Sequence, residues 1–207
     1  MEKRTLLFAT NNPHKLREIR EIAENDYQIL SLKDVNLETD IPETRETLEG
    51  NAIQKARFVY EQTGINCFAD DTGLEIDALD GRPGVYSARY AGDGCSFDDN
   101  VRKVLEELDG IDDRKACFRC VVCLILNGKE HLFEGRIPGE ITCERRGSDG
   151  FGYDPVFQPD GYIQTFAEMP AHLKNGISHR GIAVSKMFRA MIRVYMDFTG
   201  TIPPDSS

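Results

Sequence analysis

The chain has 207 residues, 40% of them hydrophobic and 29% charged, which is typical of a soluble globular protein with a sizeable core. It has no run of eighteen apolar residues, which excludes a transmembrane helix, and the short apolar stretch near the N-terminus does not suit a signal peptide. We therefore expect a cytoplasmic protein with no membrane partner. The net charge of −10 argues against binding to a nucleic-acid polymer.

The first predicted elements are a buried strand over 4–10 and a helix that begins at Pro13. Asn12 suits the cap position before that proline, and proline suits the first position of a helix. The N-terminus of a helix offers free N–H groups that bind phosphate, and Lys15 in the first turn adds a full positive charge. Taken alone, the segment FATNNPHK is more typical of an ordinary capped turn with a surface lysine.

Two aspartates stand side by side in the stretch CFADDTGLEID, residues 67–77, after a strand predicted over 27–32 and a helix predicted over 47–62. Adjacent residues of a strand face opposite sides of the sheet. If the strand persists here, one aspartate faces a binding site and the other makes the hydrogen bonds of a turn. We expect Asp71 to face the site and Asp70 to brace the turn.

Clustered carboxylates are typical ligands of Mg²⁺, which usually takes one or two carboxylates together with substrate phosphates. Glu43 and Glu46, which precede the second predicted helix, are candidate partners of Asp71 in such a site. A phosphatase of the haloacid dehalogenase type would instead require Asp-x-Asp after the strand, with both carboxylates on one side. The adjacent spacing argues against that class and leaves a charged surface turn as the structural alternative.

The second half of the chain carries further strands and helices. The strands are predicted over 74–79, 116–127 and 130–137, and the helices over 96–108 and 180–198. Ser96 and Asp99 resemble a capping box at the start of the first of these helices. Asn127-Gly128 predicts a hairpin, whose strands are antiparallel, so we expect an α/β fold with a mixed sheet.

The cysteines Cys117, Cys120 and Cys123 have a spacing that invites an iron–sulfur interpretation. They lie in a β-type run, where side chains alternate between faces, so Cys120 should point away from the other two. The fourth cysteine of the bacterial ferredoxin pattern is absent, since Asn127 stands at its position. Reduced structural thiols, as expected in the cytosol, explain these residues better.

Two polar segments in the last third of the chain complete the candidate site. In GFGYDPVF, the glycines allow close approach of a ligand, and Phe151 or Tyr153 can stack on a base. KNGISHRG gathers side-chain donors that match carbonyl or phosphate oxygens. These donors are Lys174, Ser178, His179 and Arg180. Each segment alone fits a structural turn or cap, but together with the helix start and the carboxylates they indicate a site for a nucleoside triphosphate with Mg²⁺.

The combined motifs resemble the inosine triphosphate pyrophosphatases, which hydrolyse non-standard purine triphosphates. The matching segments, in the order of that family, are ATNNPHK, NAIQKA, ADDTGLEID, PGVYSARYAG, GFGYDPVF and ISHRG. One departure is His172-Leu173, where acidic residues commonly precede the lysine matched by Lys174. The resemblance implies a single domain over 1–207, with a two-lobed α/β fold, a mixed twisted β-sheet flanked by helices, an active site in the cleft between the lobes, and a homodimer.

The resemblance also implies Mg²⁺-dependent cleavage of ITP, dITP and XTP to the monophosphate and pyrophosphate, which cleanses the nucleotide pool. It makes Asp71 the base for the attacking water, with Lys15 and Glu43 as further catalytic residues, and it makes Glu43 and Asp71 the metal ligands. The substrate-binding residues that it implies are Thr10, Asn11, Asn12, Pro13, His14, Lys15, Lys55, Thr72, Phe151, Gly152, Tyr153, Asp154, Lys174, Ser178, His179 and Arg180.

The donors of the last motif predict selectivity for the base. Hypoxanthine and xanthine carry a carbonyl where adenine carries an amino group. The donors of His179 and Arg180 would pair with that carbonyl, but the same donors would stay unpaired when they face the amino group of adenine. Two other classes remain as alternatives. A phosphomonoesterase would release orthophosphate, and a noncatalytic nucleotide-binding module would bind without turnover, although the intact set of Lys15, Glu43 and Asp71 argues against the module.

Overall fold

The fold is described from a computed structural model, which covers residues 4–23 and 26–199, with side chains described up to residue 193. The expectation of a single domain over 1–207 includes residues 1–3, 24–25 and 200–207, which lie outside this description. Over the described ranges, no helix is long and apolar enough to cross a membrane.

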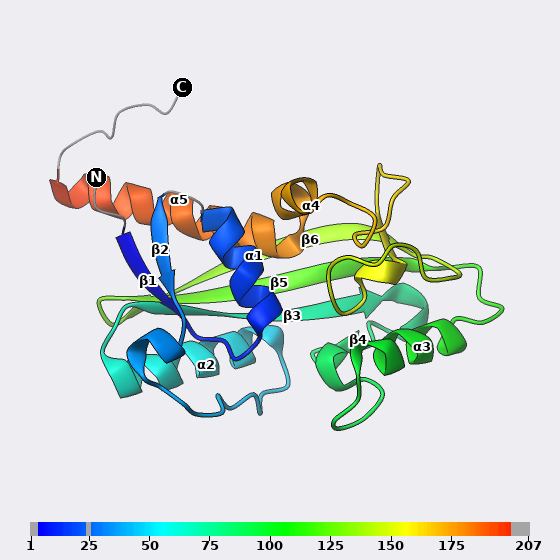
Figure 1. The fold of residues 1–207 in the computed structure, drawn as a ribbon, viewed down its shortest axis with the longest axis horizontal. Coiled ribbons are helices and arrows are strands. Elements are labelled where there is room, and N and C mark those ends of the chain that lie inside the picture. Colours follow the sequence, from blue (N-terminus) through cyan, green and yellow to red (C-terminus); the bar gives the residue numbers. More distant parts are fainter. Residues whose placement is uncertain (1–3, 24–25, 200–207) are drawn as a thin grey trace.

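A seven-stranded mixed sheet forms the centre of the molecule (Figure 1). Its strands are β1 (Arg4–Phe8), β2 (Tyr27–Leu30), β3 (Cys67–Ile76), β4 (Pro83–Gly84), β5 (Lys115–Leu126), β6 (Lys129–Ile141) and β7 (Phe157–Pro159). The order is β2-β1-β3-β5-β6-β7, and the short β4 pairs with β3. β1 is parallel to β2 and β3, whereas the other pairs are antiparallel, so the predicted α/β class with a mixed sheet is confirmed.

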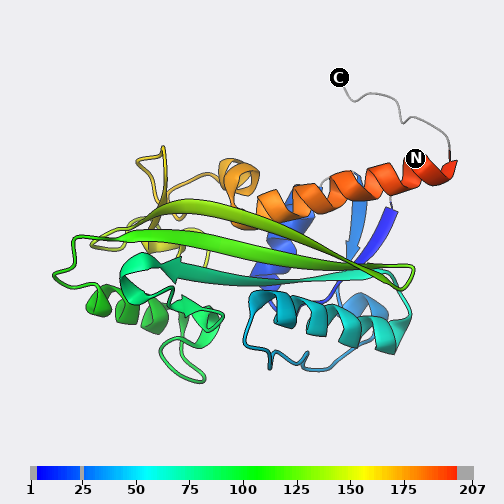
Figure 2. The same ribbon diagram turned by 180° about the vertical axis from the view of Figure 1, so that it is seen from behind.

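The helices cover both faces of the sheet, with α1, α4 and α5 on one face and α2 and α3 at opposite ends of the other (Figures 1 and 2). They are α1 (Pro13–Ala23), α2 (Leu48–Thr63), α3 (Phe97–Glu107), α4 (Ala171–Ile177) and α5 (His179–Thr199). Single turns of 3-10 helix lie at Lys33–Val35, Asp77–Leu79, Ser87–Arg89 and Asp154–Val156. Of the five helices, α4 is the one that the sequence patterns missed.

Local signals placed several of these elements correctly. Ser96 and Asp99 form the predicted capping box at the start of α3. The predicted hairpin between β5 and β6 turns at Asn127 and Gly128, both of which have positive φ, at 51° and 78°. A two-residue turn of this kind matches the twist of the two strands that it joins.

The apolar core is divided between the two ends of the long central strands. At one end, the last part of β3 and the first part of β5 pack with α3 and β7 in one cluster. At the other end, one cluster lies under α1 and α5, and another lies under α2 on the opposite face. This division gives the molecule the two lobes expected from the sequence.

The stretch with two adjacent aspartates is the middle of one long strand, which corrects the prediction of a turn braced by Asp70 and a separate strand over 74–79. β5 pairs with all of β3, from Cys67 to Ile76, and this unbroken register overrides the turn-like composition. Gly73 is required within the strand because a Cβ there would lie 2.6 Å from the carbonyl oxygen of Gly84 in β4.

The other edge of β3 is only partly covered. β1 pairs with it at Cys67 and Phe68, and β4 pairs with it at Leu74 and Glu75. Over Ala69–Gly73, no described strand occupies this edge. The sheet therefore contains a gap between its two lobes, and the side chains of β3 that border this gap can face a ligand.

The cysteine prediction is confirmed in the structure. Cys120 belongs to the cluster under α1 and α5, whereas Cys123 belongs to the cluster under α2 on the other face of the sheet. The six cysteines are free thiols, and burial raises the pKa of Cys67, Cys120 and Cys123 to about 12. These properties suit small buried apolar residues rather than cluster ligands.

Candidate active site

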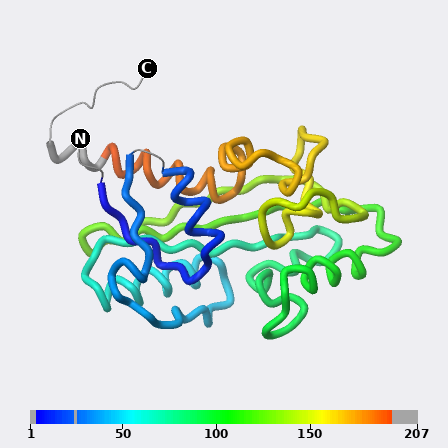
Figure 3. Tube along the Cα trace, viewed as in Figure 1, coloured from blue at the N-terminus to red at the C-terminus, as the bar shows by residue number. Residues whose placement is uncertain are grey.

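A cavity of about 570 Å³ opens at the gap in the sheet. In Figure 3, the start of α1 (blue) and the glycine-rich loop after residue 147 (yellow) both lie near the middle of the molecule, where they line this cavity. Except for Ser178 and the candidate metal ligand Glu46, every residue predicted to bind substrate or metal contributes to its wall. The lining residues that are not among the predicted site residues are Ile41, Ser87, Ala88, Phe97, Asn100 and Phe118.

The turn before α1 is held by side-chain caps. The Thr10 hydroxyl accepts a hydrogen bond from the Asn12 backbone N–H at 3.1 Å. Asn12 Oδ1 in turn accepts from the backbone N–H groups of His14 and Lys15, at 2.9 and 3.3 Å. The predicted cap is thus confirmed, and it fixes the first turn of α1 with Lys15 at the cavity.

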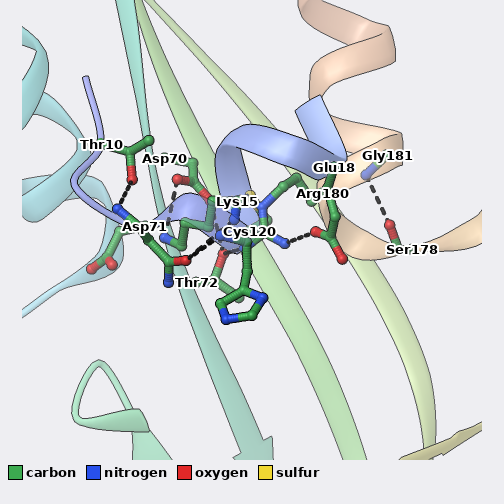
Figure 4. Close-up of polar contacts among 12 residues, drawn as sticks. Thr10, Lys15, Glu18, Asp70, Asp71, Thr72, Cys120, Ser178, Arg180 and Gly181 are labelled. Carbon is green, nitrogen blue, oxygen red and sulfur yellow. Dashed lines mark hydrogen bonds and ion pairs between the residues drawn. The ribbon is translucent and has the colours of Figure 1, made fainter. Parts of the chain in front are cut away.

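Asp70 is a buried carboxylate that joins two cations. Its Oδ1 lies 3.0 Å from Lys15 Nζ, and its Oδ2 lies 3.0 Å from Arg180 Nε. Thr72 Oγ1 is 3.2 Å from both Asp70 Oδ2 and Arg180 Nη2. Asp70 therefore positions cations at the site rather than bracing a turn, and Figure 4 shows Lys15 and Arg180 converging on this part of β3.

A second set of buried ion pairs continues from Arg180 toward the glycine-rich loop. Arg180 Nη1 donates to Glu18 Oε2, and Lys174 Nζ lies 2.6 Å from Glu18 Oε1 and 2.7 Å from Asp154 Oδ2. Lys15 and Glu18 are three residues apart, so both lie on the same side of α1. This helical spacing is the sequence signal for Glu18, which belongs to none of the matching motifs.

Together these ion pairs form one network, called here the buried ionic network, in which the cations and anions are equal in number. Its cations are Lys15, Lys174 and Arg180, and its anions are Glu18, Asp70 and Asp154. Charges removed from water are tolerated when each is paired and hydrogen-bonded. The network ties α1, β3, α4 and α5 together beneath the cavity.

A separate group of polar residues surrounds Asp71. Lys55 Nζ lies between two carboxylates, 2.6 Å from Glu43 Oε1 and 3.4 Å from Asp71 Oδ1. Asn51 Nδ2 donates to the other oxygen of Asp71 at 3.0 Å. Glu46 is exposed and does not line the cavity, so of the two glutamates only Glu43 joins this group.

The donor set at Glu43 and Asp71 fits a Mg²⁺ ion that shares its ligands with a substrate. Within the described ranges, no group of three or more His, Cys, Asp or Glu residues could hold a metal by itself. Mg²⁺, however, commonly binds through one or two carboxylates together with substrate phosphates. The ammonium of Lys55 already lies between these two carboxylates, which shows that a positive charge is stabilised there.

The two neighbouring aspartates have opposite pKa shifts. Burial alone would raise the pKa of Asp70, but Lys15 and Arg180 outweigh it and hold the pKa well below its usual range. Burial also dominates at Asp71, where Lys55 opposes it only in part, so the pKa of Asp71 is raised. Asp70 is therefore a permanent anion, whereas Asp71 takes up a proton more readily than an ordinary aspartate does.

The glycine-rich loop folds around Asp154. Asp154 Oδ2 accepts a hydrogen bond from the Phe151 backbone N–H at 2.8 Å, and Gly150, at φ 79°, leaves room for this carboxylate. Tyr153 is buried, and its hydroxyl donates to the carbonyl oxygen of Ser87 at 2.8 Å. Tyr153 thus anchors the loop to the lobe that contains α3, while Phe151 stays at the cavity.

The donors of the KNGISHRG motif have distinct positions. Lys174 lies in α4 rather than in a loop, and Ser178 is the residue between α4 and α5. Ser178 Oγ accepts from the Gly181 backbone N–H at 3.0 Å, so this residue caps α5 and is set apart from the cavity. His179 and Arg180 follow directly and line the cavity.

Glu75, near the end of β3, and Asp77, just after it, are the other acids of the stretch CFADDTGLEID, and they do not line this cavity. Glu75 pairs with Arg136 at 3.0 Å and with Arg119 at 3.8 Å on the surface of the sheet. Asp77 is exposed in the 3-10 turn that follows β3. These two acids therefore have surface roles.

His179 is a buried neutral imidazole. Its ring stacks on Phe118 with centroids 4.6 Å apart, and its Nδ1 has no hydrogen-bond partner among the described residues. Burial, reinforced by the nearby charges of Arg180 and Lys174, lowers the pKa of His179 well below its ordinary value of 6.5. A neutral imidazole can donate one hydrogen bond into the cavity and accept another.

The lowered pKa of His179 predicts a pH-dependent stability. Below pH 6.5, the unfolded chain binds a proton at His179 that the folded protein excludes. The free energy of unfolding therefore decreases as the pH is lowered, by up to about 1.4 kcal/mol per pH unit. In His179→Phe this part of the loss should vanish, while His131→Phe, at an exposed position, should retain it. Urea unfolding between pH 7.5 and 5.5 measures the difference, and equal pH dependence in wild type and His179→Phe would contradict it.

Comparisons with known proteins identify the family of this chain. Residues 6–190 match the model of the Ham1 family. The chain is 56% identical to a dITP/XTP pyrophosphatase of Porphyromonas gingivalis, covering 90% of this chain and 96% of the relative. It is 51% identical to a dITP/XTP pyrophosphatase of Flavobacterium johnsoniae, covering 88% of this chain and 95% of the relative.

Solved structures give the same result. The fold is similar to a HAM1 protein from Coxiella burnetii, with a TM-score of 0.82 and 38% identity over 92% of this chain and 99% of that one. It is also similar to the Staphylococcus aureus Ham1 protein, with a TM-score of 0.81 and 35% identity over 93% of this chain and 100% of that one. The resemblance inferred from the motifs is thus confirmed, and the chain belongs to the Ham1 family.

Proposed function

We propose that this protein hydrolyses dITP, XTP and ITP to the nucleoside monophosphate and pyrophosphate with Mg²⁺, and so removes non-standard purines from the nucleotide pool. The observation that carries the proposal is the single cavity that gathers a capped helix start, paired carboxylates, an aromatic loop and a neutral histidine. The relatives from Porphyromonas gingivalis and Flavobacterium johnsoniae, named dITP/XTP pyrophosphatases, support the same activity.

The triphosphate would lie between the start of α1 and α2. Lys15 and Lys55 both line the cavity, and each is held by buried carboxylates, so their ammonium groups are fixed before substrate arrives. Burial lowers the pKa of Lys55, but Asp71 and Glu43 raise it by more, so Lys55 stays charged. Preorganised cations of this kind stabilise the charge that develops on phosphate oxygens during transfer.

Glu43 and Asp71 would hold Mg²⁺ together with phosphate oxygens of the substrate. When bound, the ion supplies positive charge to the reacting phosphate and lowers the pKa of water near it. Asp71 is the residue that we assign as general base, because it lines the cavity and is oriented by Asn51 and Lys55. Asp70, held as an anion by Lys15 and Arg180, serves as a positioning residue.

The base would be recognised mainly by His179. The guanidinium of Arg180 already donates to Asp70, Glu18 and Thr72, so three of its five N–H donors are engaged within the buried network. His179 lines the cavity as a neutral ring with an unpaired nitrogen, and it can donate to the carbonyl of hypoxanthine or xanthine. Adenine would leave that donor unpaired, at a cost of about 1–3 kcal/mol.

One assay tests the activity. We expect incubation with Mg²⁺ to convert dITP and XTP to monophosphate and pyrophosphate, about 10-fold or more faster than dATP, since one unpaired buried donor costs that much. Monophosphate, pyrophosphate and orthophosphate are separated by ion-exchange chromatography, and omission of Mg²⁺ serves as the control. Orthophosphate as the first product would indicate a phosphomonoesterase, and binding of dITP without turnover would indicate a noncatalytic module.

Two further parts of the proposal concern assembly and compartment. We propose a homodimer, as the resemblance to the family implies, and light scattering of the purified protein would determine its mass. We also propose a cytoplasmic location, which the free thiols of the described cysteines support, because disulfides are rare in that compartment.

A further inference from the structure

Three aromatic side chains from separate segments meet at the mouth of the cavity. They are His14 in the first turn of α1, Phe97 in the first turn of α3, and Phe151 in the glycine-rich loop. The His14 and Phe151 rings are stacked, with centroids 5.2 Å apart and planes inclined by 21°. Phe97 contacts both of them, with centroids 6.0 Å from His14 and 5.9 Å from Phe151.

This contact occupies the surface on which a purine would stack. Carbon atoms in contact lie about 3.5–4.0 Å apart, so a base inserted between two parallel rings needs about 7 Å between them. The 5.2 Å between the centroids of His14 and Phe151 leaves no room for a base on the face of Phe151 that His14 covers.

The surroundings of Phe151 show which group would move. Lys174 Nζ and Arg180 Cζ also lie over the Phe151 ring, 5.3 and 5.6 Å from its centroid, and the buried ionic network holds both. The His14 imidazole makes ring contacts but, among the hydrogen bonds of the described residues, no bond to its side chain. Since only its backbone N–H is tied to Asn12, the ring can rotate away without breaking the cap.

We propose that His14 competes with the purine for the ring of Phe151, and that nucleotide binding displaces the imidazole. This inference rests on the proposed function, because it takes Phe151 as the stacking surface for the base. Phe97 supports the blocking position of His14, since its ring contacts both partners while remaining 40% exposed at the cavity.

The competition has a defined thermodynamic signature. When a site is open for only part of the time, the apparent dissociation constant rises by the inverse of the open fraction, equally for every ligand that needs the open site. An aromatic contact of this kind shifts such an equilibrium by about 2- to 10-fold. Removing the imidazole should therefore tighten binding of all purine nucleotides by the same factor and leave their ratio unchanged.

Calorimetry with an α,β-methylene analogue of dITP, which the enzyme cannot cleave, tests the inference in the presence of Mg²⁺. His14→Ala should bind the analogue about 2- to 10-fold more tightly than wild type, and the corresponding dATP analogue should gain by the same factor. His14→Phe, which retains a ring over Phe151, should bind no more tightly than wild type. Inorganic tripolyphosphate, which has no base, should bind His14→Ala and wild type equally.

Other outcomes would overturn the inference. Unchanged or weaker binding of the analogue to His14→Ala would mean that the imidazole does not compete with the base. An equal gain for tripolyphosphate would place the effect at the phosphates, and tighter binding in His14→Phe would show that a ring over Phe151 is not what blocks the base. His131→Ala, at an exposed position on β6, is the matched control and should leave all constants unchanged. Cleavage of dITP by the wild type is measured separately, so failure of the proposed function is distinguished from failure of this inference.

Discussion

Asp71→Asn is expected to lower kcat for dITP by about 10²- to 10⁴-fold, the usual contribution of a general base. Asparagine preserves the shape of the side chain but removes the charge that would attract Mg²⁺ and accept a proton from water. The neighbouring side chains keep their positions. Lys55 retains its 2.6 Å contact with Glu43, and Asn51 can still donate a hydrogen bond to the side-chain oxygen at position 71. Pyrophosphate release at saturating dITP and Mg²⁺ measures the loss.

The matched control for this substitution is Asp77→Asn. Asp77 belongs to the same acidic stretch but is exposed and lies outside the cavity, so its replacement should leave kcat unchanged. Circular dichroism and thermal melting establish that both variants are folded. A well-folded Asp71→Asn that retains more than a tenth of wild-type turnover would refute the assignment of Asp71 as the base.

Asp70→Asn is expected to reduce the free energy of unfolding by about 3–5 kcal/mol, the cost of removing one partner from a buried ion pair. Asp70 is 1% exposed and is the shared anion of Lys15 and Arg180, so its neutralisation leaves the buried Arg180 and the partly buried Lys15 with one carboxylate fewer. Because whole domains are stabilised by only about 5–15 kcal/mol, this is a large fraction. Urea unfolding at pH 7.5 gives the value.

Glu75→Gln provides the comparison on the same strand. Glu75 pairs with Arg136, whose side chain is 55% exposed, and partly exposed pairs contribute only about 0–1 kcal/mol. A similar small loss in Asp70→Asn would show that the buried ionic network adds little to stability. Turnover should also fall in Asp70→Asn, because Lys15 loses the contact that holds it at the cavity.

The features that the sequence predicts correctly are those decided by short-range geometry. The cap formed by Asn12, the hairpin at Asn127 and Gly128, and the alternation of Cys120 and Cys123 all depend on near neighbours in the chain. The motifs also identified most of the residues that line the cavity, because the family pattern covers the segments that meet there.

The errors arose where distant segments decide the structure. Asp70 was assigned to a turn because its neighbours are turn-like, but its partner Arg180 lies 110 residues further along the chain. The continuity of β3 depends on its register with β5, which no local pattern of β3 reveals. Phe97 and Phe118 looked like ordinary apolar residues of a helix and a strand, and only the tertiary arrangement brings them to the cavity.

The gap along β3 has a consequence for self-association. An uncovered sheet edge is a template on which another chain can add a strand, and proteins commonly protect such edges. Here the uncovered interval Ala69–Gly73 is short and is bounded by β1 on one side and β4 on the other. An incoming strand has no space to lie along it, so the same feature that admits a small ligand resists aggregation.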